Sequence, residues 1–350
     1  MSGLNQIAQP FPGFRHLTSH HCITGSLRHI YEFYHAPISE EMLLGLGAGV
    51  GFIYWHTKGA LPFLGGRANI ERTGVEGLEK AVGRRTGVTV NSFRTDSAAR
   101  AEKMLLEQLQ SGQPAMLVLD MGYLPYFDFA GQDFHFGYHV VVACGLDLSA
   151  RQVLLADRDE ALHPVSLETL ARARGSKYKP FPPQNAGYVF DFAGVHPPQA
   201  ADILEAIQDC AKGMLTPPIG NFGVQGIHKA ARRIRDWPKT LSEKELRETC
   251  INTAIMIDAR GGTGGGLFRY MYGRFLGEAA TITGIKELGR AGEVIKDSGD
   301  CWEQAAELFE QAYQAESTAG GLQKVCALLP EIAEREQHVW QHLIQLTSRS

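Results

Sequence analysis

One cysteine near the start of the chain, Cys22, has the surroundings that a reactive thiol needs. It directly precedes residues 23–34, in which apolar side chains recur at the spacing of one helix face. The unpaired N–H groups and the partial positive charge of a helix N-terminus favour the thiolate, which is the nucleophilic form of cysteine. Cys22 is therefore a candidate nucleophile, provided that a histidine from elsewhere in the chain reaches it.

Two later stretches supply an imidazole and a carboxylate. GYHVVVACGLD places His139 at the start of an apolar strand, and VLLADRD places Asp157 at the end of the next one. An imidazole can take the thiol proton, and a carboxylate can hold that imidazole in the required tautomer. We therefore predict a triad of Cys22, His139 and Asp157. Asp159 lies on the same side of its strand and is the alternative orienting carboxylate.

Two other roles are open for Cys22. It could pack as a small apolar residue at a helix start. It could also bind a metal with His20 and His21, but adjacent residues point in different directions, and structural zinc sites space their ligands more widely. We expect no metal site and no disulfide framework. Packing is also the interpretation for the cysteines in apolar contexts: Cys144, Cys210, Cys250, Cys301 and Cys326.

The elements that must position these residues separate the chain into two parts. Helical patterns, with one short strand, dominate up to Gly112, and strand-like runs follow from PAMLVLD to AGYVFDF. That order predicts an α+β domain with a largely antiparallel sheet. Helical patterns with few β signals follow. We therefore expect a catalytic domain over residues 1–195 and an all-helical domain over residues 196–350.

Composition limits the partners and the compartment. The 350 residues are 44% hydrophobic and 21% charged, as in ordinary globular proteins, and the net charge of −4 argues for neither nucleic acid nor an anionic membrane. The start has no signal-peptide pattern, and no apolar run approaches the roughly 20 residues that span a bilayer. We expect a cytoplasmic protein without a nucleic-acid or membrane partner.

Two glycine-rich stretches could contribute to binding. Residues 45–52 follow a helix and have no strand before them, so a dinucleotide loop is disfavoured, although this loop and the following Tyr54 and Trp55 could line a substrate cleft. Residues 260–279 place glycines before a helix, where backbone N–H groups favour an anion. Close helix packing is the alternative use of these glycines.

A short basic segment, residues 228–239, groups lysines and arginines around one helix. It is either a solvated face or a dock for an acidic carrier protein, whose charge would raise the encounter rate.

Beyond these local patterns, HCITGSLRHIYEFYHAPISEEMLLGLGAGVGFIYW, GYHVVVACGLD and VLLADRD together resemble the N-terminal domain of the butirosin biosynthesis protein H family. That family is related to papain-like peptidases, including the bacteriocin-leader peptidases. The helical half, with GGTGGGLFRYMYGRFLGEAA, is similar to the domain of unknown function that often follows it. The resemblance covers almost the whole chain. It implies a papain-like fold and transfer of an aminoacyl chain from a carrier-protein thioester to an aminoglycoside amine.

The chain departs from the papain-like pattern at one point. Such enzymes usually carry a glutamine a few residues before the cysteine as an oxyanion donor, and FRHLTSHHC has none. The N–H of Cys22 could supply one donor, and a nearby side chain could supply another. The candidates are His16, Thr18, Ser19, His20 and His21. This departure disfavours peptide hydrolysis more than thioester chemistry, because a thioester is already activated.

The residues and the resemblance together predict acyl transfer through a Cys22 thioester. His139 takes the thiol proton, the acyl group moves to sulfur, and an amine or water releases it. The expected donor is an acyl carrier protein or coenzyme A, so a phosphopantetheine-linked thioester is a co-substrate and no cofactor is tightly bound. The predicted substrate-binding residues are His21, Tyr54, Trp55, Tyr138, Arg260, Thr263 and Arg269.

In the last of these predictions, Arg260 and Arg269 would hold a substrate carboxylate or the phosphate of a phosphopantetheine arm. Two other functions stay open. They are a cysteine peptidase or amidohydrolase, and a catalytically silent binding protein with the same fold. The acyl group, the acceptor and the oligomeric state, a homodimer included, are left open as well.

Overall fold

Two compact units make up the chain, and each consists of two segments. The computed structural model describes residues 8–69, 76–129, 131 and 133–348. The sheet unit comprises residues 1–40 and 86–197, and the helical unit comprises residues 41–85 and 198–350. The expected division at residue 195 lies beside the last junction. Residues 41–85 were expected in the N-terminal domain. They instead pack with the later helices, where Gly51 and Phe52 contact Arg269 and Trp302.

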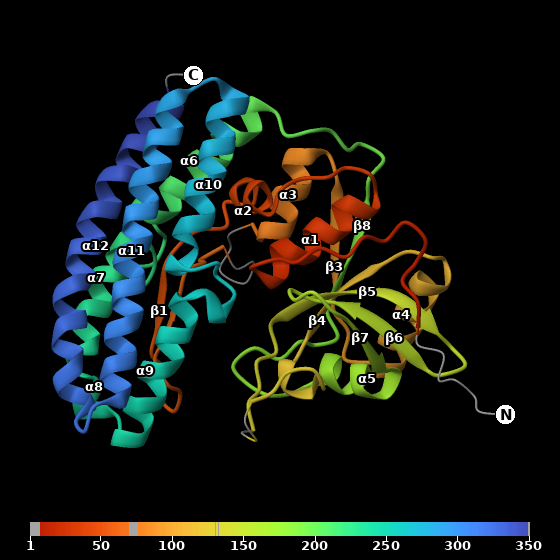
Figure 1. The fold of residues 1–350 in the computed structure, drawn as a ribbon, viewed down its shortest axis with the longest axis horizontal. Coiled ribbons are helices and arrows are strands. Elements are labelled where there is room, and N and C mark those ends of the chain that lie inside the picture. The colour runs from red at the N-terminus through yellow and green to blue at the C-terminus, as the bar shows by residue number, and fades with distance from the viewer. Residues whose placement is uncertain (1–7, 70–75, 130, 132, 349–350) are drawn as a thin grey trace. The chain divides into compact units, whose positions relative to one another are not determined.

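A six-stranded antiparallel sheet forms the centre of the sheet unit, with the strand order β3-β8-β4-β5-β6-β7 (Figure 1). The strands are β3 (Thr89–Phe93), β4 (Ala115–Leu119), β5 (His139–Asp147), β6 (Gln152–Ala156), β7 (Leu162–Ser166) and β8 (Gly187–Asp191). Strands β4, β5 and β6 are buried over most of their length. Their continuous Val, Leu and Ala runs are typical of strands covered on both faces.

Three helices cover this sheet. They are α1 (Cys22–Phe33), α4 (Ala98–Gln110) and α5 (Leu167–Gly175). Helices α4 and α5 form one apolar core with side chains such as Leu117 and Val141, and α1 packs on the same two strands. Figure 1 shows α1 and α5 on opposite sides of the sheet. The prediction of helices followed by an antiparallel sheet is confirmed.

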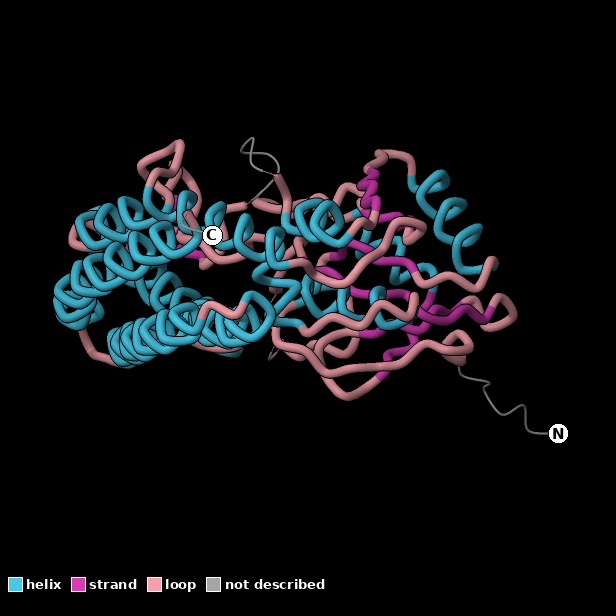
Figure 2. Tube along the Cα trace, turned by 90° about the horizontal axis from the view of Figure 1, so that it is seen from above, coloured by secondary structure: helices cyan, strands magenta, loops and turns pink. Residues whose placement is uncertain are grey.

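The helical unit is built almost entirely of helices, as the colours of Figure 2 show. Its helices are α2 (Glu40–Leu46), α3 (Leu78–Thr86), α6 (Ala200–Leu215), α7 (Gly223–Ile234), α8 (Trp237–Thr240), α9 (Glu243–Ile257), α10 (Arg269–Thr283), α11 (Lys286–Gln314) and α12 (Thr318–Thr347). A two-stranded antiparallel pair, β1 (Ile53–Trp55) and β2 (Phe63–Gly65), accompanies them. The sequence patterns did not predict this pair.

A buried carboxylate ties the long helices of this unit together. Glu336 on α12 forms a bidentate ion pair with Arg269 on α10, with both N–O distances 2.8 Å and both side chains fully buried. It also accepts hydrogen bonds from Ser298, Trp302 and Trp340. Burial raises the pKa of Glu336, but Arg269 and these donors lower it by more. The carboxylate therefore stays charged inside the core.

Residues 41–85 complete the same core. The carbonyl of Gly51 accepts a hydrogen bond from Arg269, and Phe52 stacks on Trp302 with ring centroids 5.5 Å apart. Among the described residues, no helix combines the length and the apolar character needed to cross a membrane, although α11 and α12 have 29 and 30 residues.

Candidate active site

The chain around Cys22 is fixed by a buried carboxylate. Helix α1 begins at Cys22, and Glu40 accepts hydrogen bonds from the backbone N–H groups of His20 and His21 and from the hydroxyl of Thr24. The imidazole of His21 caps the helix by accepting from the N–H of Thr24. The thiol is thus placed at a helix N-terminus whose preceding backbone is held in position. His21, predicted to bind substrate, is used here as a buried helix cap.

A second contact joins the imidazole to the carboxylate. His139 Nε2 lies 2.7 Å from Asp157 Oδ2, and both side chains are buried. His139 begins β5 and Asp157 directly follows β6, and these strands pair antiparallel with Val142 opposite Ala156. The start of β5 and the end of β6 therefore lie side by side at the same end of the sheet. Asp159 instead forms hydrogen bonds with His163, so Asp157 is the carboxylate that faces His139.

The thiol and the imidazole complete the cluster. Burial raises the pKa of the Cys22 thiol, but the hydrogen bond with His139 and the positive charges of His139 and Arg158 lower it by more. Burial lowers the pKa of His139, whereas Asp157 and Cys22 raise it to about 9. Each partner thus favours the charged form of the other. This arrangement favours a thiolate–imidazolium pair over the uncharged pair.

Tyr126 is a further member of the cluster. Its hydroxyl donates to Asp157 Oδ2 at 2.9 Å, which is the oxygen that also faces His139, and its ring stacks on His163. Burial raises the pKa of Asp157, but His139 and the Tyr126 hydroxyl lower it to about 2. Burial and the Asp157 charge raise the pKa of Tyr126, so the phenol remains a donor. Neither Tyr126 nor Arg158 was predicted. No spacing pattern links Tyr126, a loop residue, to a distant strand.

The other predicted binding residues are divided between the two units. Tyr138 is half-buried beside His139 in the sheet unit. Tyr54 and Trp55 belong to β1 of the helical unit, where the Tyr54 hydroxyl accepts from Trp237 Nε1 at 3.1 Å. In helix α2, which precedes β1, Gly45 lies against the ring of Phe275, so close packing explains the glycine.

The predicted anion site has internal partners instead. Arg260 pairs with Asp258 and Glu310, and Arg269 pairs with Glu336. The hydroxyl of Thr263 donates to the carbonyls of residues 257 and 258. The backbone N–H of residue 266 donates to the carboxylate of residue 303. The chain's own carboxylates thus occupy the place of the expected anion.

The described residues hold no group of three or more His, Cys, Asp or Glu side chains arranged to bind a metal ion. What the sheet unit does present is a buried imidazole in contact with a carboxylate, and a thiol at a helix N-terminus whose pKa that imidazole lowers. Sites of this class suit nucleophilic chemistry at sulfur.

Sequence comparison places the chain in a family. The chain belongs to the family described as Domain of unknown function (DUF4872), whose model matches residues 168–343, or 176 of 350 residues. The family model described as Butirosin biosynthesis protein H, N-terminal, matches residues 21–158, a range that includes Cys22, His139 and Asp157. This order of two matches confirms the predicted resemblance. A search of curated proteins finds no match.

The lowered pKa predicts that Cys22 reacts with iodoacetamide at a pH where an ordinary thiol does not. A free cysteine has a pKa near about 8.5, and a thiol with a lower pKa keeps its thiolate as the pH falls below that value. Site-resolved peptide mass spectrometry between about pH 5 and 9 would measure the rate. Cys301, which is also partly exposed, is the internal reference. Equal pH profiles for the two thiols would contradict the prediction.

Replacement of Asp157 by asparagine is expected to lower turnover by about 10²- to 10⁴-fold, because an amide neither holds the imidazole tautomer nor stabilises the imidazolium. The pKa of His139 would fall and that of Cys22 would rise, so fast alkylation would move to higher pH. The matched control is Asp159→Asn, since that carboxylate contacts His163 instead. Full activity in Asp157→Asn together with loss in Asp159→Asn would transfer the orienting role to Asp159.

Proposed function

We propose that this protein is a cysteine-dependent acyltransferase that works in the biosynthesis of an antibiotic or a related metabolite. The cluster of Cys22, His139 and Asp157 is the observation that carries the proposal. The match to the N-terminal domain of butirosin biosynthesis protein H supports the biosynthetic setting. We further propose that the sheet unit is a papain-like domain, since its cysteine opens a helix and its histidine and aspartate lie on successive antiparallel strands.

The proposed reaction has two steps with one acyl-enzyme between them. The Cys22 thiolate attacks the thioester carbonyl, the bond from that carbon to the donor sulfur breaks, and His139 gives its proton to the leaving thiol. An amine then attacks the Cys22 thioester, the bond to the Cys22 sulfur breaks, and His139 takes the amine proton. Asp157 and Tyr126 hold the imidazole throughout.

The proposed donor is an acyl carrier protein or coenzyme A, and the proposed acceptor is a small-molecule amine. A thioester asks less of an oxyanion site than an amide does, which suits a chain without the usual glutamine before its cysteine. Arg232, Arg233 and Arg235 are exposed on and just after α7, and they form the proposed docking surface for an acidic carrier protein.

Trapping of the acyl-enzyme tests this function. The full chain is mixed with acetyl-coenzyme A or with acetyl and octanoyl thioesters of N-acetylcysteamine, quenched in acid, and analysed by intact-mass and peptide mass spectrometry. We expect an acyl group on the Cys22 peptide. The corresponding amides are the matched control. Cleavage of amides without acylation by thioesters would favour a peptidase or amidohydrolase, and a Cys22 that reacts with neither would favour a silent binding protein.

A further inference from the structure

A row of aromatic rings begins at the imidazole of the candidate active site. The edge of Phe127 meets His139 with ring centroids 5.5 Å apart and an interplanar angle of 85°. Phe129 stacks on Phe127 at 5.9 Å, and Phe134 contacts Phe129 at 4.7 Å. We call Phe127, Phe129 and Phe134 the aromatic row. It leads from a buried catalytic candidate to the surface of the sheet unit.

The aromatic row exposes apolar surface where burial would be favourable. Phe134 is 39% exposed, and Phe127 and Phe129 are partly exposed. Phenylalanine side chains have some of the largest apolar surfaces of any residue, and such surface left open to water in one patch commonly marks a binding site. The contact between Phe127 and His139 therefore places this apolar surface beside the imidazole of the candidate active site.

The segments that carry the row are anchored on the sheet unit. The buried carboxylate of Asp120 lies 2.8 Å from His135 Nδ1 and 2.5 Å from the Ser176 hydroxyl, and it also accepts from the backbone N–H of Gly122. At the other end, the hydroxyl of Tyr126, directly before Phe127, donates to the carboxylate at the active site. These contacts hold the neighbours of Phe127 and Phe134 in place, and a preorganised ring lowers the entropic cost of binding a ligand.

We propose that the aromatic row binds a medium-length aliphatic acyl chain attached to Cys22. The inference rests on the proposed function and names its donor class, a thioester of an apolar acyl group. The acyl carbonyl would sit at the thiol, and the chain would pass the imidazole and lie along Phe127, Phe129 and Phe134.

Chain length provides the first measurement. Burial of each added methylene favours binding by up to about four-fold. We expect the rate constant for Cys22 acylation by octanoyl-N-acetylcysteamine to exceed that for the acetyl thioester by at least about ten-fold. Phe129→Ala and Phe134→Ala should each lower this octanoyl-to-acetyl ratio several-fold. Phe134 is exposed, so its replacement tests the row without disturbing the core.

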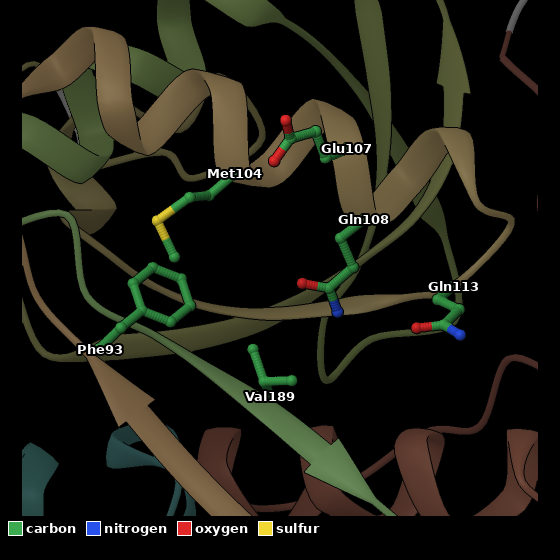
Figure 3. Close-up of a pocket in the computed structure, with 6 residues that line it drawn as sticks. All are labelled: Phe93, Met104, Glu107, Gln108, Gln113 and Val189. Carbon is green, nitrogen blue, oxygen red and sulfur yellow. The ribbon is translucent and has the colours of Figure 1, made fainter.

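A matched control comes from another hollow of the sheet unit. Phe93, Met104 and Val189 line a cavity of about 260 Å³ between β3, β8 and α4 (Figure 3). The cavity is also lined by Glu107, Gln108 and Gln113. None of these residues belongs to the aromatic row or to the active-site cluster. Phe93→Ala therefore removes a comparable ring, and we expect it to keep the octanoyl-to-acetyl ratio of the unsubstituted protein.

A second probe separates this inference from the proposed function. N-octyl iodoacetamide and iodoacetamide alkylate Cys22 without acyl transfer, and we expect the octyl reagent to react several-fold faster unless Phe129 or Phe134 is replaced. A length ratio near one, or one that survives both substitutions, would overturn the row's role while acylation itself stood. If no thioester acylated Cys22 but the octyl preference persisted, the proposed acyl transfer would be rejected and the apolar binding surface would be retained.

The thiol part of the donor is the alternative group that would contact the aromatic row in place of the acyl chain. At a fixed octanoyl group, coenzyme A and N-acetylcysteamine donors differ in the thiol part alone. If Phe129→Ala or Phe134→Ala changed the preference between these two donors and left the chain-length ratio intact, the row would bind the pantetheine arm, and the inference would be overturned.

Discussion

Cys22→Ala is expected to abolish acyl-enzyme formation and to lower turnover by about 10⁴-fold or more, because nucleophile loss removes the covalent path altogether. The buried thiols of Cys144, Cys210 and Cys250 do not offer a substitute. Burial raises the pKa of Cys144, Cys210 and Cys250 to about 12, and none of them contacts His139. Intact-mass spectrometry after mixing with a thioester measures the acylated fraction directly.

The control for this prediction is Cys301→Ala, which removes another partly exposed thiol. We expect it to keep turnover and acylation. The thermal midpoint of Cys22→Ala should stay within a few degrees of the unsubstituted protein, since the change deletes one atom from a partly exposed side chain. Turnover that persisted in a folded Cys22→Ala protein would remove the nucleophile assignment and, with it, the proposed reaction.

Arg269→Met is expected to destabilise the helical unit by about 3–5 kcal/mol, because it leaves the Glu336 carboxylate buried without its cation. Urea unfolding, followed by circular dichroism, would measure the free energy of unfolding. The paired comparison is Arg274→Met, which breaks a partly exposed ion pair with Glu41 and should cost at most about 1 kcal/mol. Equal losses in the two variants would show that the buried pair is not a special element of this core.

The pH dependence of that loss has a definite sign. In the unsubstituted protein the folded pKa of Glu336 lies below its usual value of 4.5, so its stabilising effect is present above pH 4.5 and is lost as the pH falls through the folded pKa. Without Arg269, burial dominates and raises that pKa. The penalty of Arg269→Met should therefore grow as the pH rises from 4 to 7, and Arg269→Met combined with Glu336→Gln should recover part of it.

Local sequence patterns predicted the parts of the site that depend on nearby residues. The apolar spacing after Cys22 located helix α1, and the continuous apolar runs located β5 and β6 with His139 and Asp157 at their ends. Antiparallel pairing then brings those two ends together. These features depend on periodicity and on strand order, both of which are visible in one sequence.

Contacts between distant loops were not predictable in the same way. Glu40 is the first residue of helix α2, and its carboxylate holds the backbone before Cys22. Tyr126 reaches Asp157 from a loop without regular spacing. Arg269 was expected to bind a substrate anion, whereas its partner is a glutamate 67 residues later on another helix. The sequence shows that a residue is charged, but only the folded structure shows which residue it pairs with.

The division of the helical unit into residues 41–85 and 198–350 has a consequence for protein synthesis. On the ribosome, Gly51 and Phe52 emerge well before Arg269 and Trp302, with which they pack. At rates of roughly 5–20 residues per second, the delay between the synthesis of these residues and of their partners is on the order of ten seconds or more. The strands of the sheet unit are complete by residue 197. That unit can therefore fold first, while the inserted residues 41–85 still lack their partners in the later helices. A gene cut at residue 195 would put residues 41–85 on one product and residues 198–350 on the other, so neither product would contain the whole core of the helical unit.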